Sequence, residues 1–414
     1  MIPLGHIFRE LFAERTRVLL TILAIAWGTA SITTMLAVGE GLRQMFGRSM
    51  RGFGENVLVV APGQTSQPYN GLPEGHPIRL RREDIQRMRI SIPQLGSISG
   101  EHMNWTPMRH GSHFRTGRLM GVEPDYGSMR NIIAEQGGRF LNELDMQGQR
   151  RVAIIGPEVA KELFPTGEQP VGQYIEINSR PFLVIGVMRK KHQSTTFGGP
   201  DRDGTWIPAT TFEPMFDRRD FSYVIARPRS SEEMPLLKER MRRAVAYSAG
   251  ADPRDEEILN YWDMLEIQQI SGNNFTGLQI LFGIIGGLTL VVAGVGVANV
   301  MYVSVSNAAR DIGIRMATGA RTHQVLGQYV LEGLIATALG GILGMGASAL
   351  LVWGIGQIPM QGDFFDIVGK PLPILSTQVT ATVVVILGAI GLTAGYFPAR
   401  RAAQVDPAIA LRQQ

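Results

Sequence analysis

Few residues of this 414-residue chain have the types and spacing that catalysis or metal binding needs. Cysteine is absent, which excludes disulfides, thiolate zinc sites and cysteine nucleophiles. The sequence also lacks G-x-x-x-x-G-K-[ST], H-E-x-x-H and G-x-S-x-G, so it predicts no nucleotide-binding P-loop, zincin helix or hydrolase elbow. We therefore expect a chain that is not an enzyme, binds no metal and needs no cofactor of its own.

Two clusters come nearest to a metal site. His110 and His113 stand three residues apart, and Glu101 and His102 precede them, but zinc needs further ligands of defined geometry. The segment 201–204 (DRDG) carries two acids, yet it lacks the spaced acids and the final Glu of an EF-hand loop. We interpret the first cluster as a surface loop and the second as a turn.

The charged residues divide the chain into two kinds of segment. The net charge is only +4, from 40 basic and 36 acidic residues, which excludes a strongly basic nucleic-acid-binding chain and an acidic disordered one. Residues 43–266 hold 30 of the basic and 28 of the acidic residues. The other 190 residues are therefore almost free of charge, and they predict a membrane-embedded part beside a charged globular domain.

Four charge-free stretches of 22, 43, 30 and 29 residues mark the apolar part. About 20 apolar residues in a helix cross a hydrocarbon core of about 30 Å, and a charge inside it is costly. The sequence therefore predicts four transmembrane helices, at residues 18–39, 277–303, 329–356 and 375–397. Buried helices of a soluble protein are the alternative, but such helices seldom run this long without a charged face.

The basic residues of the short flanks predict the orientation. Arginine is enriched in residues 1–17, which also form a predicted amphipathic helix, in the segment 304–328 and in the tail 398–414. We expect these three parts, and so both termini, to be cytoplasmic. The segment 357–374 and the domain at 40–272 are then extracytoplasmic.

The flanks and the middle of the extracytoplasmic domain have different sequence patterns. Each flank predicts strand–helix–strand: NVLVVA at 56–61, a helix at 81–89 and LGSIS, then YVIA at 223–226 and a helix at 231–247. The middle, at about 109–221, has short β-branched runs such as RRVAIIG, QYIEIN and PFLVIGVM, separated by turn signals. We predict an α/β domain that carries an inserted, mainly β subdomain.

Glycine pairs four residues apart occur in three of the predicted spans, which permits close helix–helix approach. The pairs are Gly283 with Gly287, Gly340 with Gly344, and Gly391 with Gly395. A dimer or moving interface and ordinary packing within the chain both explain them.

Several motifs together resemble the MacB/FtsX-like permease family of ABC transporters. They are NAARDIGIRMATGAR at 307–321, PARRAAQVDPAIALR at 398–412, GVEPDY at 121–126, GRF at 138–140, GP at 156–157, PVG at 170–172 and VIGV at 184–187. The resemblance covers nearly the whole chain and implies a four-span subunit with an α/β "porter" layer and a β "sabre" insertion. Asp311 and Thr318 depart from it, because the family usually has Glu and an aliphatic residue there.

The resemblance also implies a coupling site for an ATPase. Its residues in the cytoplasmic segment are Arg310, Asp311, Ile312, Gly313, Ile314, Arg315, Met316, Gly319 and Arg321. Those in the tail are Pro398, Arg400, Arg401, Asp406 and Pro407. Arginine can form charge-assisted bonds with an acidic partner, Ile312, Ile314 and Met316 can act as apolar knobs, and glycine permits close approach. A merely solvated connection is the alternative.

The expected function is that of a permease subunit in the bacterial inner membrane, which exports an amphiphile, antibiotic or peptide. Because the chain starts almost at its first span, a separate ABC subunit is expected to bind ATP and Mg²⁺. The further expected partners are the lipid bilayer, a second permease in a homodimer or heterodimer and, for an exporter, a periplasmic adaptor; nucleic acid is not expected. A lipoprotein-releasing permease, a regulator of an external cell-wall hydrolase and a membrane sensor are the alternatives.

Overall fold

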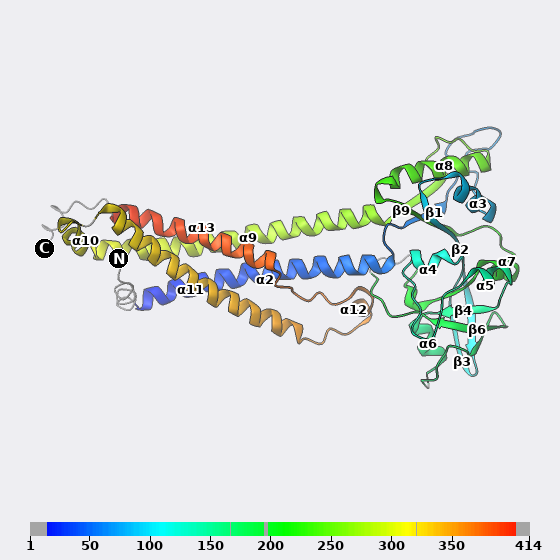
Figure 1. The fold of residues 1–414 in the computed structure, drawn as a ribbon, viewed down its shortest axis with the longest axis horizontal. Helices are drawn as coiled ribbons and strands as arrows, with labels where there is room; N and C mark the ends of the chain where they lie inside the picture. The colour runs from blue at the N-terminus through cyan, green and yellow to red at the C-terminus, as the bar shows by residue number, and fades with distance from the viewer. Residues whose placement is uncertain (1–14, 166, 194–197, 320, 403–414) are drawn as a thin grey trace. The chain divides into compact units, whose positions relative to one another are not determined.

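The computed structural model describes residues 15–165, 167–193, 198–319 and 321–402, which form two compact units (Figure 1). The helical unit comprises the described residues up to 45 together with 273–360 and 371–402. The sheet unit comprises 46–272 and 361–370 within the same described ranges. Residues 1–14, most of the predicted amphipathic helix, lie outside the description.

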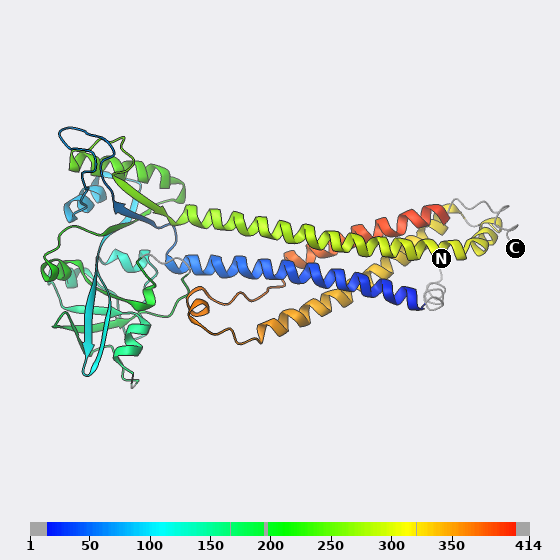
Figure 2. The ribbon, with the colours of Figure 1, turned by 180° about the vertical axis from the view of Figure 1, so that it is seen from behind.

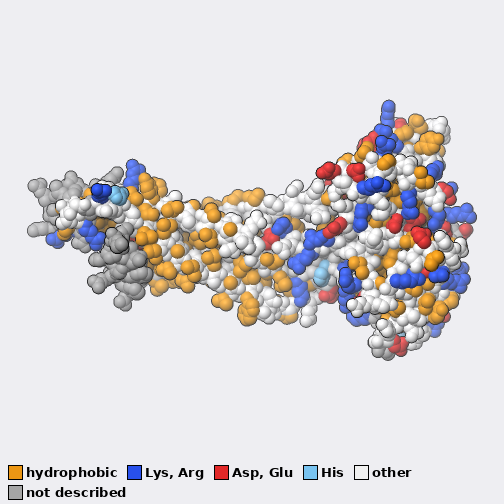
Figure 3. All heavy atoms as spheres, in the orientation of Figure 1, with side chains coloured by type: hydrophobic (Ala, Val, Ile, Leu, Met, Phe, Trp, Pro, Cys, Tyr) orange, Lys and Arg blue, Asp and Glu red, His pale blue; other side chains and the backbone are white. Residues whose placement is uncertain are grey.

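The helical unit contains four helices that are long and apolar enough to cross a membrane. They are α2 (Arg15–Phe53), α9 (Met264–Asn307), α11 (Thr322–Gly356) and α13 (Thr377–Ala402). Each predicted span falls within one of them, apart from the first residues of the fourth. Apolar side chains are frequent on the visible face of this unit (Figure 3). The prediction of four apolar helices is confirmed. All four are longer than a bilayer requires, because capping and turn signals rather than charge decide where a helix ends.

Small residues let α11 lie directly against α2, which runs beside α9 when seen from behind (Figure 2). A Cβ atom on Gly344 would lie 2.5 Å from the backbone oxygen of Ala26. One turn further along, the hydroxyls of Thr34 and Ser348 are 3.0 Å apart and share a hydrogen bond. Glycine at this contact is therefore required by the close approach of two backbones.

The pair Gly391 and Gly395 has the same role between α13 and α11. A Cβ on Gly395 would meet the backbone of Val330, and one on Gly391 would collide with Thr337. Two of the three predicted glycine pairs thus pack within the chain. For the third, Gly283 and Gly287 on α9, no described atom lies within 4 Å of an added Cβ.

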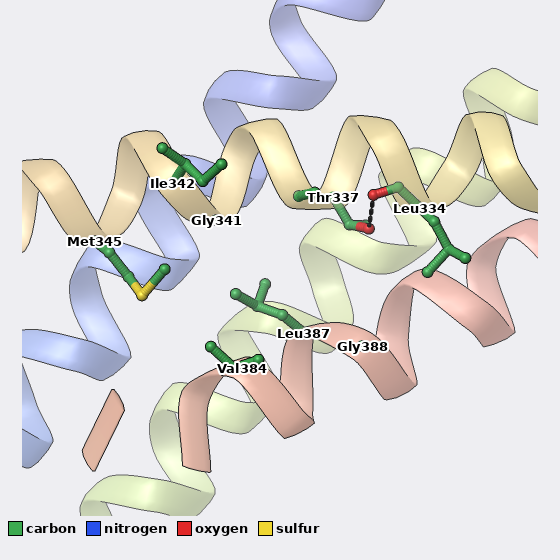
Figure 4. A pocket seen from close by; sticks show the side chains of 9 residues that line it. Leu334, Thr337, Gly341, Ile342, Met345, Val384, Leu387 and Gly388 are labelled. Carbon is green, nitrogen blue, oxygen red and sulfur yellow. Dashed lines mark hydrogen bonds between the residues drawn. The ribbon is translucent and has the colours of Figure 1, made fainter. Parts of the chain in front are cut away.

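An apolar cavity of about 260 Å³ remains between α11 and α13 (Figure 4). Met345, Ile342, Val384 and Leu387 line it, and the hydroxyl of Thr337 turns away to donate a 3.0 Å hydrogen bond to the backbone oxygen of Leu334. With its only hydroxyl bonded to backbone, this cavity offers a ligand no polar anchor.

The described part of the sheet unit has one continuous sheet, in the order β3-β7-β4-β6-β5-β2-β8-β1-β9. The strands are β1 (Leu58–Pro62), β2 (Leu95–His110), β3 (His113–Val122), β4 (Val152–Ile155), β5 (Tyr174–Ile177), β6 (Arg180–Val187), β7 (Gly204–Pro208), β8 (Tyr223–Pro228) and β9 (Leu259–Asp263). The helices of this unit are α3 (Arg82–Ser91), α4 (Asp125–Met129), α5 (Glu143–Gln147), α6 (Pro157–Leu163), α7 (Ala209–Phe216), α8 (Met234–Ala249) and α12 (Asp363–Val368), with 3₁₀ turns η1 (Asp201–Asp203) and η2 (Ser231–Glu233).

The two flanks form a split β-α-β layer, as the sequence predicts. The units β1–α3–β2 and β8–α8–β9 interlock in the strand order β2-β8-β1-β9, with every neighbouring pair antiparallel. Ile85 and Met88 of α3 and Leu237 and Met241 of α8 are buried in one apolar cluster against this layer. This is the ferredoxin-like arrangement.

The inserted strands close into a ring. β3 pairs with both β7 and β2, so β2-β3-β7-β4-β6-β5 return to their starting strand. The long strand β2 belongs to both parts: Leu95–Glu101 pairs with β8, and Glu101–His110 pairs with β3. The predicted start of the insertion at residue 109 therefore falls inside a strand that the two layers share.

The sheet unit contains a buried network of charges. Arg130, which is 1% exposed, donates to both carboxylate oxygens of Asp201 at 2.9 and 3.2 Å, and Lys191 approaches the same carboxylate at 2.9 Å. Burial alone would raise the pKa of Asp201, but Arg130, Lys191 and Arg118 outweigh it and hold this pKa well below the usual aspartate range. The segment 201–204 is therefore an anchor of the fold, and its first acid is fully engaged by cations.

Candidate coupling site

The predicted cytoplasmic loop at 304–328 is helical over most of its length, which corrects the prediction. It contains the end of α9, the short helix α10 (Ala309–Ala317) and the start of α11. α10 follows Asn307 after a single residue, since the N–H of Ile312 already donates to the backbone oxygen of Ala308 at 2.9 Å. Apolar residues four apart, Ile312 and Met316, give the segment an inward face and explain why it folds as a helix.

The turn between α10 and α11 depends on glycine. Thr318 closes α10 with its N–H bonded to the backbone oxygen of Ile314 at 3.0 Å. Gly319 follows at φ +102°, a conformation that favours glycine. Arg321 then precedes α11, and its N–H donates to the side chain of Gln324 at 3.1 Å.

The two faces of α10 differ in exposure. Ile312 is 3% exposed and belongs to the buried cluster of the helical unit, where Met316 packs against the same cluster. On the other face, Arg310 is exposed, and Ile314 is 43% exposed. Ala317 and Thr318 extend this exposed face, which the spacing i, i+4, i+7, i+8 of an amphipathic helix could have identified.

Three residues of the predicted site are less accessible to a partner than the exposed ones. Ile312 is not an exposed knob, because it is buried with Val305 of α9 and Tyr329 of α11. Gly313 is buried as well. Arg315 is half-buried, and one of its guanidinium nitrogens donates to Gln328 of α11 at 3.3 Å. A partner would meet Arg310 and Ile314 first, with Gly319 and Arg321 exposed beyond the end of α10.

The tail residues lie partly within α13 and partly outside the description. Pro398 is buried, Arg400 is exposed, and Ala399 between them belongs to the same buried cluster as Ile312. Arg401 lies in α13 and Asp311 in α10. Asp406 and Pro407 lie outside the described residues.

Nowhere in the described ranges do three His, Asp or Glu side chains converge as a metal site would require. His110 and His113 are paired across the β2–β3 hairpin, and His110 bonds to the backbone oxygen of Tyr174 at 2.9 Å. α10 presents the guanidinium of Arg310 and the apolar side chain of Ile314 on its exposed face. Its other face is packed into the helical unit through Ile312.

Comparison with known proteins agrees with this architecture. Residues 18–244 match the family described as MacB-like periplasmic core domain, and residues 283–407 match the FtsX-like permease C-terminal family. The macrolide export ATP-binding/permease protein MacB of Rhodospirillum rubrum is 32% identical over 407 residues, and the pyoverdine export ATP-binding/permease protein PvdT of Pseudomonas aeruginosa is 31% identical over 413. These alignments cover 97% and 98% of this chain but 59% and 58% of the relatives, so the chain spans less than two thirds of their length. A solved structure, the periplasmic region of MacB from Actinobacillus actinomycetemcomitans, aligns with 54% of this chain and 96% of its own length at 18% identity and a TM-score of 0.43.

The chain thus has four helices that are long and apolar enough to cross a membrane, with a large domain between the first two of them. It belongs to the family of MacB-like and FtsX-like permeases, as its motifs predict. Its four apolar helices and α/β core agree with that family.

Proposed function

We propose that this chain is the permease component of an ABC export system in the bacterial inner membrane. In this role it takes no part in ATP hydrolysis itself and transmits the motion of an ATP-binding partner to its extracytoplasmic domain. The names of its relatives, which export macrolides and pyoverdine, favour export of an amphiphile, antibiotic or peptide over lipoprotein release or control of a cell-wall hydrolase.

The observation that carries this proposal is the two-faced helix α10. Its inward face is fixed in the helical unit by Ile312, so a push on the exposed face is transferred to α9 and α11 rather than absorbed by a loose loop. Its outward face presents Arg310 and Ile314, a cation and an apolar knob suited to a groove with an acidic rim. α9 is one unbroken helix from Met264 to Asn307, which gives motion a path along the chain.

ATP must be bound outside these 414 residues, because they contain no P-loop. The relatives are named as combined ATP-binding/permease proteins, so the same division of labour occurs there within one chain. We propose a separate ATP-binding subunit here and a pair of permeases, identical or different, in the complex. The unpartnered pair Gly283 and Gly287 on α9 is the place we assign to contact between the two permeases.

The proposal is tested by purifying the full chain alone and together with an ABC ATP-binding subunit from the same organism. Alone, the chain should hydrolyse no ATP above background, whereas the complex should hydrolyse ATP and respond to the permease. Hydrolysis by the chain alone that survives removal of contaminants, or the absence of any complex, would refute the proposal.

The proposed orientation places both termini in the cytoplasm and the sheet unit outside. Because the chain has no cysteine, single cysteines at Ser222 and at Gln413 report on the two sides without background. An impermeant thiol reagent added to intact spheroplasts should label the first position and not the second. Labelling of position 413 in sealed spheroplasts would contradict the orientation.

A further inference from the structure

A polar cavity of about 280 Å³ lies in the helical unit among α2, α9 and α13. Its lining is mostly hydrogen-bonding side chains, which is unusual for helices of this apolarity. At about 30 Å³ per water molecule, it has room for roughly nine waters. That size suits a small polar group better than a whole drug-sized ligand.

The cavity is held open by a fixed carboxylate–guanidinium pair. Glu40, which is 6% exposed, accepts hydrogen bonds from Arg43 at 2.8 and 2.9 Å and from Gln44 at 2.8 Å. Gln279 of α9 donates a fourth bond to the same carboxylate at 3.1 Å. Four donors saturate the lone pairs of Glu40, so this acid orients Arg43 and is not itself free to bind a ligand.

Arg43 keeps donors for a ligand. Its Nε and Nη2 atoms bind Glu40, whereas Nη1 has no partner among the described residues. The side chain is 47% exposed and lines the cavity. It is the only cationic side chain in that lining, and no anionic one except the saturated Glu40 accompanies it. The Glu40–Arg43 pair is neutral overall, but the donors that it leaves free belong to the guanidinium, and they favour an anion.

The start of α13 adds donors on the opposite wall. Ser376, which precedes α13, and Gln378 and Thr382 of its first turns line the cavity, at the positive end of a 26-residue helix. This end is fixed against α2, because the N–H of Ile374 donates to the backbone oxygen of Ala37 at 2.9 Å. Gly41 permits that contact, since any Cβ there would collide with the backbone of Leu372.

We propose that this cavity binds the phosphate-type anionic head group of an amphiphile that is dissolved in the membrane. Arg43 forms the charge-assisted bonds, and the hydroxyl and amide groups of α13 complete the shell. The cavity adjoins the outer end of the first predicted span, where lipid head groups lie in the proposed orientation. This placement rests on the proposed function, which sets the orientation of the spans. The proposal narrows the substrate of the exporter to an amphiphile with a phosphate-type anionic head group.

The test uses the full chain in detergent and measures retained phosphatidylglycerol by native mass spectrometry. Wild type should retain this lipid, and Arg43→Gln should retain it about tenfold more weakly, the loss expected for one charge-assisted hydrogen bond. Arg51→Gln, which removes an arginine of the same helix outside the cavity, should match wild type. Thr382→Trp fills the cavity while Arg43 stays, and it should weaken retention as much as Arg43→Gln.

If Arg43→Gln retains less phosphatidylglycerol but Thr382→Trp retains as much as wild type, the lipid is attracted to an exposed charge and does not occupy the cavity. That result would overturn the proposed site. Equal retention of phosphatidylglycerol by all variants would overturn the site as well. So would retention of diacylglycerol, which has no phosphate, as strongly as phosphatidylglycerol. If Arg43→Gln does not fold, Gln378→Leu takes its place in the comparison.

Titration with inorganic phosphate separates the two sources of this chemistry. Displacement of the lipid by phosphate indicates a site for the free anion, and the absence of displacement indicates a site for the lipid; both support binding of the phosphate group.

The ATP-binding subunit is co-purified with the same variants. An intact complex that has lost phosphatidylglycerol is the expected result. Retention of the lipid without any complex would refute the proposed function and leave the cavity assignment standing.

Discussion

The sheet unit and the helical unit bury polar groups in opposite ways. The sheet unit buries whole charges, and the carboxylate of Asp201 is surrounded by Arg130, Lys191 and Arg118. Among its described residues the helical unit buries far fewer charges, namely the acids Glu40 and Glu332, and it brings backbones together at Gly344 and Gly395. Both follow one rule, that a buried polar group needs a partner. A domain surrounded by water can supply charged partners, whereas helices in lipid satisfy their backbone internally and gain stability from close packing.

The largest expected effect comes from breaking the charge network. Asp201→Asn leaves three buried or half-buried cations with one neutral partner, and loss of one member of a buried ion network costs about 3–5 kcal/mol. The change in the free energy of unfolding is measured by chemical unfolding of the full chain in detergent, monitored with a probe in the sheet unit. Asp217→Asn, at an exposed aspartate, is the control and should change stability by less than about 0.5 kcal/mol. Equal effects of the two variants would contradict the account.

The network also predicts a pH dependence. Because the pKa of Asp201 is lower in the folded than in the unfolded chain, its stabilisation is complete above the ordinary aspartate range. It is lost as the pH falls below that range towards the folded-state pKa. Asp201→Asn should lack this acid-induced loss, and the two unfolding curves should therefore converge at low pH.

A smaller effect is expected from the packing of the helical unit. Gly344→Leu places a side chain against the backbone of Ala26, and overpacking of this kind typically costs about 1–3 kcal/mol. Gly346→Leu is a matched control two residues away, where no described atom lies within 4 Å of an added Cβ. Thermal unfolding in detergent should separate the two variants. Equal stabilities would show that α2 and α11 do not pack closely at Gly344.

Much of this architecture could be predicted from the sequence. Each charge-free stretch overlaps one of the four apolar helices. The turn at Asn178 and Ser179, both at positive φ, joins β5 to β6 where the sequence has a turn signal. Both features depend on residues that are neighbours in the sequence, so they can be predicted without knowledge of the fold.

What the sequence did not reveal depends on contacts between distant residues. The anchoring role of Asp201 comes from Arg130, 71 positions earlier, so the segment 201–204 looked like an ordinary turn. The cavity around Arg43 joins three helices, and Glu40 and Arg43 alone resemble any charged end of a span. In the coupling segment, the sequence-based prediction treats Ile312 and Met316 as knobs of a loop, although their four-residue spacing is that of one face of a helix.

The central claim is that the exposed face of α10 receives the ATP-binding subunit. It is tested most directly by co-purifying that subunit with Ile314→Asp and with Arg310→Glu, beside Ile90→Asp as a control at another exposed isoleucine. Both α10 variants should insert and fold normally, since neither side chain is buried, yet each should bind the subunit about tenfold more weakly, as expected from losing an interfacial contact. The control should bind as wild type does. If the α10 variants retain the subunit and its stimulated ATP hydrolysis in full, α10 is a structural connection between spans and the coupling assignment is wrong.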